Sequence, residues 1–401
     1  MRVNAHSHVF TFQTFLTAAA ETNLKARLMA WHLSEAAAND AVKLARKVLL
    51  GEDAETRLAV FAARHHLEGN PLLEFLRRGC LPDISAVTDP LMADSASGAG
   101  EEEETLAAVL MMDVVDGDSL PWELALYEEQ FKDTALQAER WPGRALPFVA
   151  VNPLRGAQAL DYLRRGLEEG LCVGVKLYPS LGYTARDPMI ARIMQACQDA
   201  SAPVVMHCND GGFCWPDYAC TYCSPMAWAD VIADYDVRFD FAHCGDQTPG
   251  KPESATHPSW RDYIGTLMDR FPDRVYADVS YQSGPLGKED EQQRYVAWLK
   301  SQMATPRGDN ILFGTDSFML LQACADADYW AFFKTALGAG DFARIAATNP
   351  ARFLGLPAAG ETPGAATSLG RHVAYLRERR HGPGSRFGEG GRPASWLAGL
   401  L

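Results

Sequence analysis

Short apolar runs recur along the chain, separated by polar, glycine-rich turns and by stretches with helical spacing. From the second run onward they start roughly 25 to 40 residues apart, which is about the length of one βα unit. The runs are continuous rather than alternating, as expected for strands that are buried on both faces of a parallel sheet. Eight such units predict an α/β fold of the (β/α)8 TIM-barrel type. The expected strands are Arg2–Ala5, Ala107–Val115, Leu146–Val151, Cys172–Tyr178, Pro203–His207, Val237–His243, Val275–Ser280 and Ile311–Thr315.

The interval between the first and second strands is much longer than the others, and much of it has helical spacing. We therefore predict a helical insertion after strand 1, at about residues 20–100. Loops that follow barrel strands lie on the catalytic face, so this insertion is a candidate lid. The alternative is a helical decoration away from the site. The expected helices are Glu35–Leu50, ending before Gly51, then Asp53–Leu67 with Asp53 as its cap, and Pro71–Gly79.

Two segments look irregular. Ser95–Glu104, with the sequence SASGAGEEEE, is rich in turn residues and acidic, and we expect a loop there. Beyond Pro357 the composition shifts to Gly, Pro, Ala and Arg. We assign residues 1–356 to the barrel and 357–401 to an irregular C-terminal tail that is partly disordered or contacts another subunit.

Composition narrows the range of partners. The chain has 401 residues, 47% of them hydrophobic, and a net charge of −14 without a basic stripe, so we expect neither nucleic acid nor a membrane surface as a partner. No apolar stretch approaches the ~20 residues that span a bilayer. Nine cysteines without compact repeated spacing argue against a disulfide framework. We therefore expect a cytoplasmic protein that acts on a small molecule, with a homodimer as the expected assembly.

Four of the ten histidines fall at the ends of expected strands. His6 and His8 are two residues apart, so in a strand both side chains face the same side. His207, His243 and Asp316 end later strands. In a parallel barrel the carboxyl ends of all strands meet at one face, so these five side chains can converge.

Imidazoles and a carboxylate suit Zn²⁺, and mixed nitrogen and oxygen donors also accept Mn²⁺ or Fe²⁺. Such an ion lowers the pKa of a bound water from ~15.7 toward ~7, and a nearby base must then accept a proton. Each residue has a simpler explanation when taken alone: His207 could be a buried core histidine and Asp316 a helix cap. The hypothesis of one divalent metal ion depends on all five occurring together at strand ends.

In several segments the chain resembles the amidohydrolase superfamily. The resemblance is to its amidohydrolase-related branch, which contains metal-dependent hydrolases and enzymes of the aminocarboxymuconate-semialdehyde and resorcylate decarboxylase types. It covers neither the insertion nor the tail. The matching segments are Asn4–Phe10, Pro147–Pro153, Gly174–Tyr183, Val204–Cys208, Phe241–Gly245, Leu312–Phe318 and Thr348–Leu356.

The resemblance implies a role for each strand-end residue. His6 and His8 match the first-strand metal ligands, and His207 matches the fifth-strand ligand. Asp316 matches the eighth-strand ligand, which also accepts a proton. His243 matches a histidine that acts as catalytic acid or base, with direct ligation as the lesser alternative.

Three further residues are candidates for substrate binding. Lys176 could hold a substrate carboxylate, be a buried structural lysine, or carry a carbamate that bridges two metals. Tyr178 and Asp210 are expected beside the pocket, with core packing and a plain turn as the respective alternatives.

The C-x-x-C pair Cys220 and Cys223 admits a structural zinc site, although ordinary cysteines are the simpler interpretation.

The leading functional prediction is a metal-dependent hydrolase that uses an activated water on an amide, lactone or ester-like bond of a small molecule. The first alternative is a non-oxidative decarboxylase of an aromatic or unsaturated carboxylic acid with the same metal ligands. A third hypothesis is a catalytically inactive barrel that serves as a scaffold.

Overall fold

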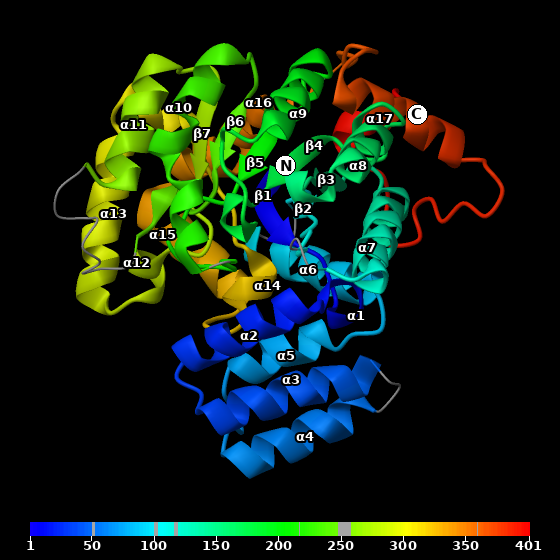
Figure 1. Ribbon diagram of the computed structural model, residues 1–401. Coiled ribbons are helices and arrows are strands. Elements are labelled where there is room, and N and C mark those ends of the chain that lie inside the picture. The colour runs from blue at the N-terminus through cyan, green and yellow to red at the C-terminus, as the bar shows by residue number, and fades with distance from the viewer. Residues whose placement is uncertain (50–52, 100–102, 116–118, 216, 248–257, 359) are drawn as a thin grey trace.

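The computed structural model describes all residues except 50–52, 100–102, 116–118, 216, 248–257 and 359. Eight parallel strands follow one another in sequence order around a nearly closed barrel, with helices outside them (Figure 1). The predicted TIM-barrel fold is therefore confirmed. The strands are β1 (Arg2–His8), β2 (Thr105–Leu110), β3 (Ala145–Ala150), β4 (Gly174–Leu177), β5 (Val204–Met206), β6 (Phe239–Phe241), β7 (Val275–Asp278) and β8 (Ile311–Leu312).

Every residue of β2 through β8 is buried, because the barrel interior covers one face of the sheet and helices cover the other. This explains why the strands appear in the sequence as continuous apolar runs. The helices that follow β2 are α7 (Pro121–Arg140), α8 (Ala157–Leu167), α9 (Pro188–Asp199), α10 (Pro225–Asp234), α11 (Trp260–Arg270), α12 (Ser283–Leu286), α13 (Glu289–Met303), α14 (Ser317–Leu320), α15 (Asp326–Ala343), α16 (Asn349–Leu354) and α17 (Ser368–Arg379).

Backbone hydrogen bonds between β1 and the segment after β8 bring the two ends of the sheet together. The Ala5 amide donates to the Phe313 carbonyl at 2.8 Å, and the Asp316 amide donates to the His6 carbonyl at 2.8 Å. The first and last strands thus place His6 and Asp316 side by side.

Side chains reinforce the same junction. The Asn4 side chain donates to Thr315 Oγ1 at 2.8 Å and accepts from the Thr315 amide at 3.0 Å. A Cβ atom at Gly314 would lie 2.7 Å from the Cβ of His6, so a glycine is required where the chain passes β1.

In the described part of the interval between β1 and β2 there are six helices, and four of them, α2–α5, lie together beyond one end of the barrel (Figure 1). As predicted, Asp53 caps a helix: its carboxylate accepts from the Thr56 amide at 2.8 Å. The predicted stop at Gly51 lies outside the described residues. The helices are α1 (Phe12–Phe15), α2 (Ala18–Ala30), α3 (Glu35–Leu49), α4 (Ala54–His65), α5 (Leu72–Gly79) and α6 (Ile84–Ala99).

The loop prediction for Ser95–Glu104 is wrong at its beginning, because α6 continues to Ala99. Small residues let α6 approach α15 closely: a Cβ at Gly98 would lie 2.6 Å from the Trp330 side chain. Ser95, fully buried, donates to Asp326 at 3.5 Å. Packing against another helix therefore outweighs the weak helix propensity of this segment.

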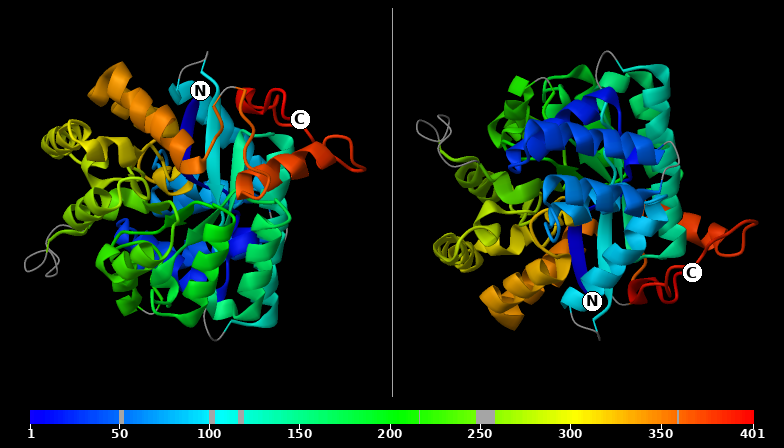
Figure 2. Two further views of the ribbon diagram at one scale, coloured as in Figure 1. Left: turned by 90° about the horizontal axis from the view of Figure 1, so that it is seen from above. Right: turned by 90° about the horizontal axis from the view of Figure 1, so that it is seen from below.

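The C-terminal segment contains one regular helix, α17, which packs on its own barrel at the edge of the molecule (Figure 2). Ser368 donates to the Val173 carbonyl at 2.7 Å. His372 is buried, and its Nδ1 lies 2.7 Å from the Gly170 carbonyl oxygen. Among the described residues, no helix is both long and apolar enough to cross a membrane.

Burial lowers the pKa of His372 to about 4, below the ~6.5 expected in the unfolded chain. Between these values the unfolded state binds more protons than the folded state, so stability falls as the pH falls. We expect the wild-type protein to lose about 2 kcal/mol through this residue between pH 7 and pH 5. Denaturant unfolding of wild type and His372→Asn at both pH values measures the effect, and a parallel loss of stability in both proteins would contradict it.

Candidate active site

A small pocket opens at the carboxyl ends of the strands. It encloses about 380 Å³ of empty space, including open solvent at its mouth. The strand-end residues that line it come from five different βα units. They are His8, Tyr178, His207, His243 and Asp316, and aromatic, methionine and arginine side chains complete the wall.

Three predicted ligands come together here: His8 and Asp316 line the pocket, and His6 is fully buried beside them. Nε2 of His6 lies 4.0 Å, and Nε2 of His8 3.9 Å, from Oδ1 of Asp316. Donor atoms of these three residues lie within 4.8 Å of one another. Within the described part of the chain, His6 Nε2 and Asp316 Oδ1 are buried without a hydrogen-bond partner, which is costly in the absence of a ligand. The arrangement fits a divalent cation.

Asp278, at the end of β7, was missed by the sequence analysis. Its Oδ2 lies 2.7 Å from Nδ1 of His6, and its Oδ1 accepts from the amides of His243, at 2.9 Å, and Ser280, at 3.0 Å. With Nδ1 protonated, His6 presents the lone pair of Nε2 to the pocket. A signal existed, because Asp278 is a carboxylate within the expected strand Val275–Ser280, two residues before its end. His6, His243 and Asp278 also form a second group of converging donor atoms.

His207 lies in the same pocket but outside both groups of converging donors. Its Nδ1 is 3.2 Å from Nε2 of His243, and its Nε2 is 3.3 Å from the Gly211 carbonyl oxygen. The imidazole stacks on Tyr178, with ring centroids 4.0 Å apart. The assignment of His207 as a ligand stays a prediction.

The backbone is strained around the pocket. His243 (φ 62°), Asp316 (φ 54°) and Tyr281 (φ 43°) all have left-handed conformations, which cost about 1–3 kcal/mol each for residues other than glycine. Such strain persists only where the surrounding structure fixes it, and here it aims side chains into one small pocket.

Burial controls the charges of the site. It lowers the pKa of His8 and His207 well below the usual range and that of His243 to about 3, so all three rings are neutral at pH 7. Neutral imidazole is the form that ligates metals. Burial also raises the pKa of Asp316 to about 6, against the opposing influence of the His6 and Lys176 charges.

The three expected substrate-binding residues are placed differently. Tyr178 lines the pocket. Lys176 is buried beneath it: burial lowers its pKa to about 8, and its Nζ has no hydrogen-bond partner in the described part of the chain. It lines a smaller neighbouring cavity. Asp210 is buried in the loop after β5 but is not part of the pocket wall. Their roles stay predictions.

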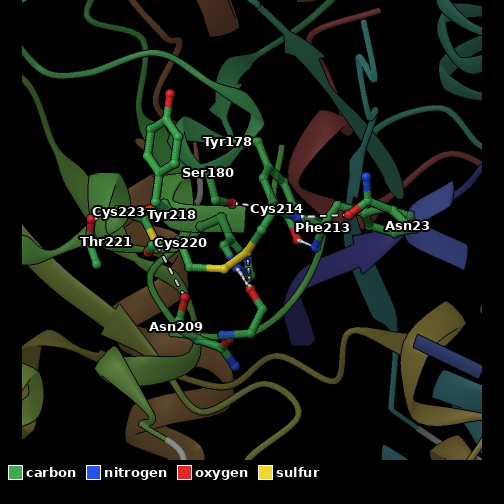
Figure 3. Close-up of a disulfide and its surroundings, with 12 residues drawn as sticks. Asn23, Tyr178, Ser180, Asn209, Phe213, Cys214, Tyr218, Cys220, Thr221 and Cys223 are labelled. Carbon is green, nitrogen blue, oxygen red and sulfur yellow. Dashed lines mark hydrogen bonds between the residues drawn. A yellow bond between two sulfur atoms is a disulfide. The ribbon is translucent and has the colours of Figure 1, made fainter. Parts of the chain in front are cut away.

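The cysteine spacing argued against a disulfide framework, but the described residues do contain a disulfide, between Cys214 and Cys220 (Figure 3). Cys220 therefore has no thiolate for the structural zinc considered with Cys223. The disulfide lies in the loop after β5, where the Phe213 amide donates to the Tyr178 hydroxyl at 3.0 Å. It restrains a wall of the pocket, because Phe213 is part of that wall.

The comparison with known families gives one match, the family described as Amidohydrolase, over residues 91–356. This is more than half of the chain, which therefore belongs to the amidohydrolase family. The match begins inside α6 and leaves out β1 and α1–α5.

The similar proteins with solved structures have low sequence identity to this chain. An uncharacterized TIM-barrel protein from Bordetella bronchiseptica is 20% identical, with 70% of this chain and 88% of that chain covered and a TM-score of 0.48. A probable 2-pyrone-4,6-dicarboxylic acid hydrolase from Acinetobacter baumannii is 12% identical, with 66% and 88% covered and a TM-score of 0.45. No curated protein matches the chain.

The contact between Asp278 and His6 predicts a measurable effect on metal binding. Asp278→Asn removes the carboxylate that orients His6, so we expect metal affinity to fall by about 10- to 100-fold. Competition with a chromophoric chelator measures the affinity. Asp234→Asn, at the exposed end of α10, is the matched control. An unchanged affinity in folded Asp278→Asn would show that Asp278 does not act through His6.

Proposed function

We propose that the protein is a metal-dependent hydrolase that acts on an amide, lactone or ester-like bond of a small molecule. The ligands are His6, His8, His207 and Asp316, and the ion is Zn²⁺, with Mn²⁺ or Fe²⁺ as alternatives. The observation that carries the proposal is the pair of buried, unpartnered atoms His6 Nε2 and Asp316 Oδ1, with His8 beside them.

Hydrogen bonding at His207 supports its place among the ligands. The lowered pKa leaves one N–H on this ring, yet both of its nitrogens face acceptors when His243 Nδ1 donates to the Ser280 carbonyl at 3.1 Å. His207 can then donate to only one of its two neighbours, His243 Nε2 or the Gly211 carbonyl oxygen, and its other nitrogen faces an acceptor without a proton. A cation at that nitrogen would satisfy the lone pair.

A bound divalent ion would supply two things: a lowered pKa for a water molecule and polarisation of the bond to be cleaved. The protein residues do the rest. Asp316, with a pKa that burial raises, accepts the proton of the attacking water. His243 is neutral, and its ring is held by the Ser280 carbonyl, so it can donate a proton to the leaving group only after it has received one from Asp316 or the water.

The decarboxylase alternative uses the same donors, and the reaction products separate the two. Metal-loaded protein is incubated with amides, lactones, esters and aromatic acids in ¹⁸O-labelled water. Incorporation of ¹⁸O into the product supports hydrolysis. Release of CO2 without ¹⁸O would replace the proposal with decarboxylation. Absence of turnover together with absence of bound metal would indicate an inactive scaffold.

The role of Asp316 predicts a loss of turnover. Asp316→Asn keeps the size of the side chain but removes the proton acceptor, and we expect kcat to fall by about 10²- to 10⁴-fold. Steady-state kinetics at equal metal occupancy measure the effect. Asp328→Asn, exposed on α15, is the control. Full activity of Asp316→Asn would refute the assignment.

A further inference from the structure

One face of α2, in the insertion, is directed at the active-site pocket. Asn23, Arg27 and Trp31 are spaced by four residues, so their side chains lie along one side of this helix. Asn23 accepts from the Cys214 amide at 3.0 Å, which attaches the helix to the loop after β5 (Figure 3). Trp31 packs on Phe75 of α5, with ring centroids 5.2 Å apart. Contacts on both sides thus hold Arg27 in place.

Arg27 lines the pocket and has few partners of its own. Its guanidinium lies 5.6 Å from the ring centroid of Trp31. Its Nε is buried and makes no hydrogen bond within the described ranges, and no ion pair of Arg27 is found there. A guanidinium offers five N–H donors in a fixed plane, which suits a bidentate partner such as a carboxylate.

Two glycines keep the space between Arg27 and the catalytic histidines open. A Cβ at Gly211 would lie 3.2 Å from Nη1 of Arg27, and a Cβ at Gly212 would lie 2.8 Å from Nε2 of His207. Arg27 and His207 therefore border the same short stretch of chain. Side chains at Gly211 and Gly212 would press on Arg27 and on His207.

The remaining wall fits an apolar body. Met112, Phe213 and Met319 line the pocket, together with the polar side chains of Asn209 and Tyr281. A ligand here meets one cation from the insertion, apolar side chains along its length, and the His and Asp donors at its reacting end.

We propose that Arg27 binds a carboxylate of the substrate, so that the enzyme acts on small, partly apolar carboxylic acids. One guanidinium balances one carboxylate charge, whereas a phosphate dianion would remain half-neutralised. The inference rests on the proposed function and adds a substrate class to it. The residue belongs to α2, outside the part of the chain that matches the family, so this subsite is a feature of the insertion.

Binding of paired probes tests the proposal. Benzoate, cyclohexanecarboxylate and glutarate, together with their amides and phenyl phosphate, are titrated by calorimetry into metal-loaded and chelator-treated protein. We expect wild type to prefer at least one carboxylate over its amide and over phenyl phosphate. Arg27→Gln should weaken that carboxylate by about 10-fold or more in both metal states, and Arg27→Lys should lose less.

Lys25→Gln is the matched control, because Lys25 lies on the same helix and pairs with Glu35 at 2.8 Å on the surface; its binding should match wild type. Equal binding by Arg27→Gln and wild type, binding that depends only on the metal, or no preference for carboxylates in wild type would each overturn the proposal. A preference for phenyl phosphate that depends on Arg27 would overturn the substrate class.

Kinetics separate this inference from the proposed hydrolysis. With a carboxylate substrate, Arg27→Gln should raise KM by about 10-fold or more and leave kcat within a small factor, since Arg27 binds a part of the substrate that does not react. Arg27-dependent carboxylate binding without any hydrolysis would leave the subsite standing and refute the proposed function. Hydrolysis at an unchanged KM in Arg27→Gln would support the proposed function and refute the carboxylate subsite.

Discussion

The carboxylate of Asp278 lies beneath the pocket, fully buried, and accepts from four donors: the His6 ring, the Ser280 hydroxyl and the amides of His243 and Ser280. Burial opposes the charge, but the interaction with His6 and the other donors lower the pKa of Asp278. A buried anion of this kind is stable only while the donors keep their positions. It therefore couples β1, β6 and β7 and sets the tautomer of His6, on which the arrangement with His8 and Asp316 depends.

The pocket combines two parts of the chain with different constraints. The barrel provides the donors from strand ends and tolerates left-handed backbone at His243 and Asp316 to aim them. The insertion provides Arg27 from a regular helix and is attached to the loop after β5 through Asn23. The disulfide between Cys214 and Cys220 restrains this loop. The proposed chemistry and the proposed substrate recognition therefore depend on separate elements.

Burial determines how much of the fold and of the candidate site could be predicted from the sequence. The strands were recognisable because both of their faces are covered, and His6, His8 and Asp316 because strand ends converge. Asp278 lies inside the expected strand Val275–Ser280 rather than at its end, and its role depends on a contact with His6, 272 positions away. The sequence placed a helical insertion at about residues 20–100, but the helices expected from the spacing began at Glu35 and did not include α2, so Arg27 was missed. The spacing of the cysteines did not indicate which two of them form a disulfide. The weak helix propensity of Ser95–Ala99 predicted a loop, because the packing of this segment on Trp330 depends on the tertiary structure.

The closure of the barrel has a consequence for how the site forms. Asn4 and Thr315, which join its two ends, are separated by 311 positions in the chain. Asp316 follows His6 and His8 at a similar separation, so it is synthesised long after them. No partly made chain can complete this set of donors, and the long loop must close before the contact forms. Tight binding of a metal would therefore mark the end of folding rather than its beginning.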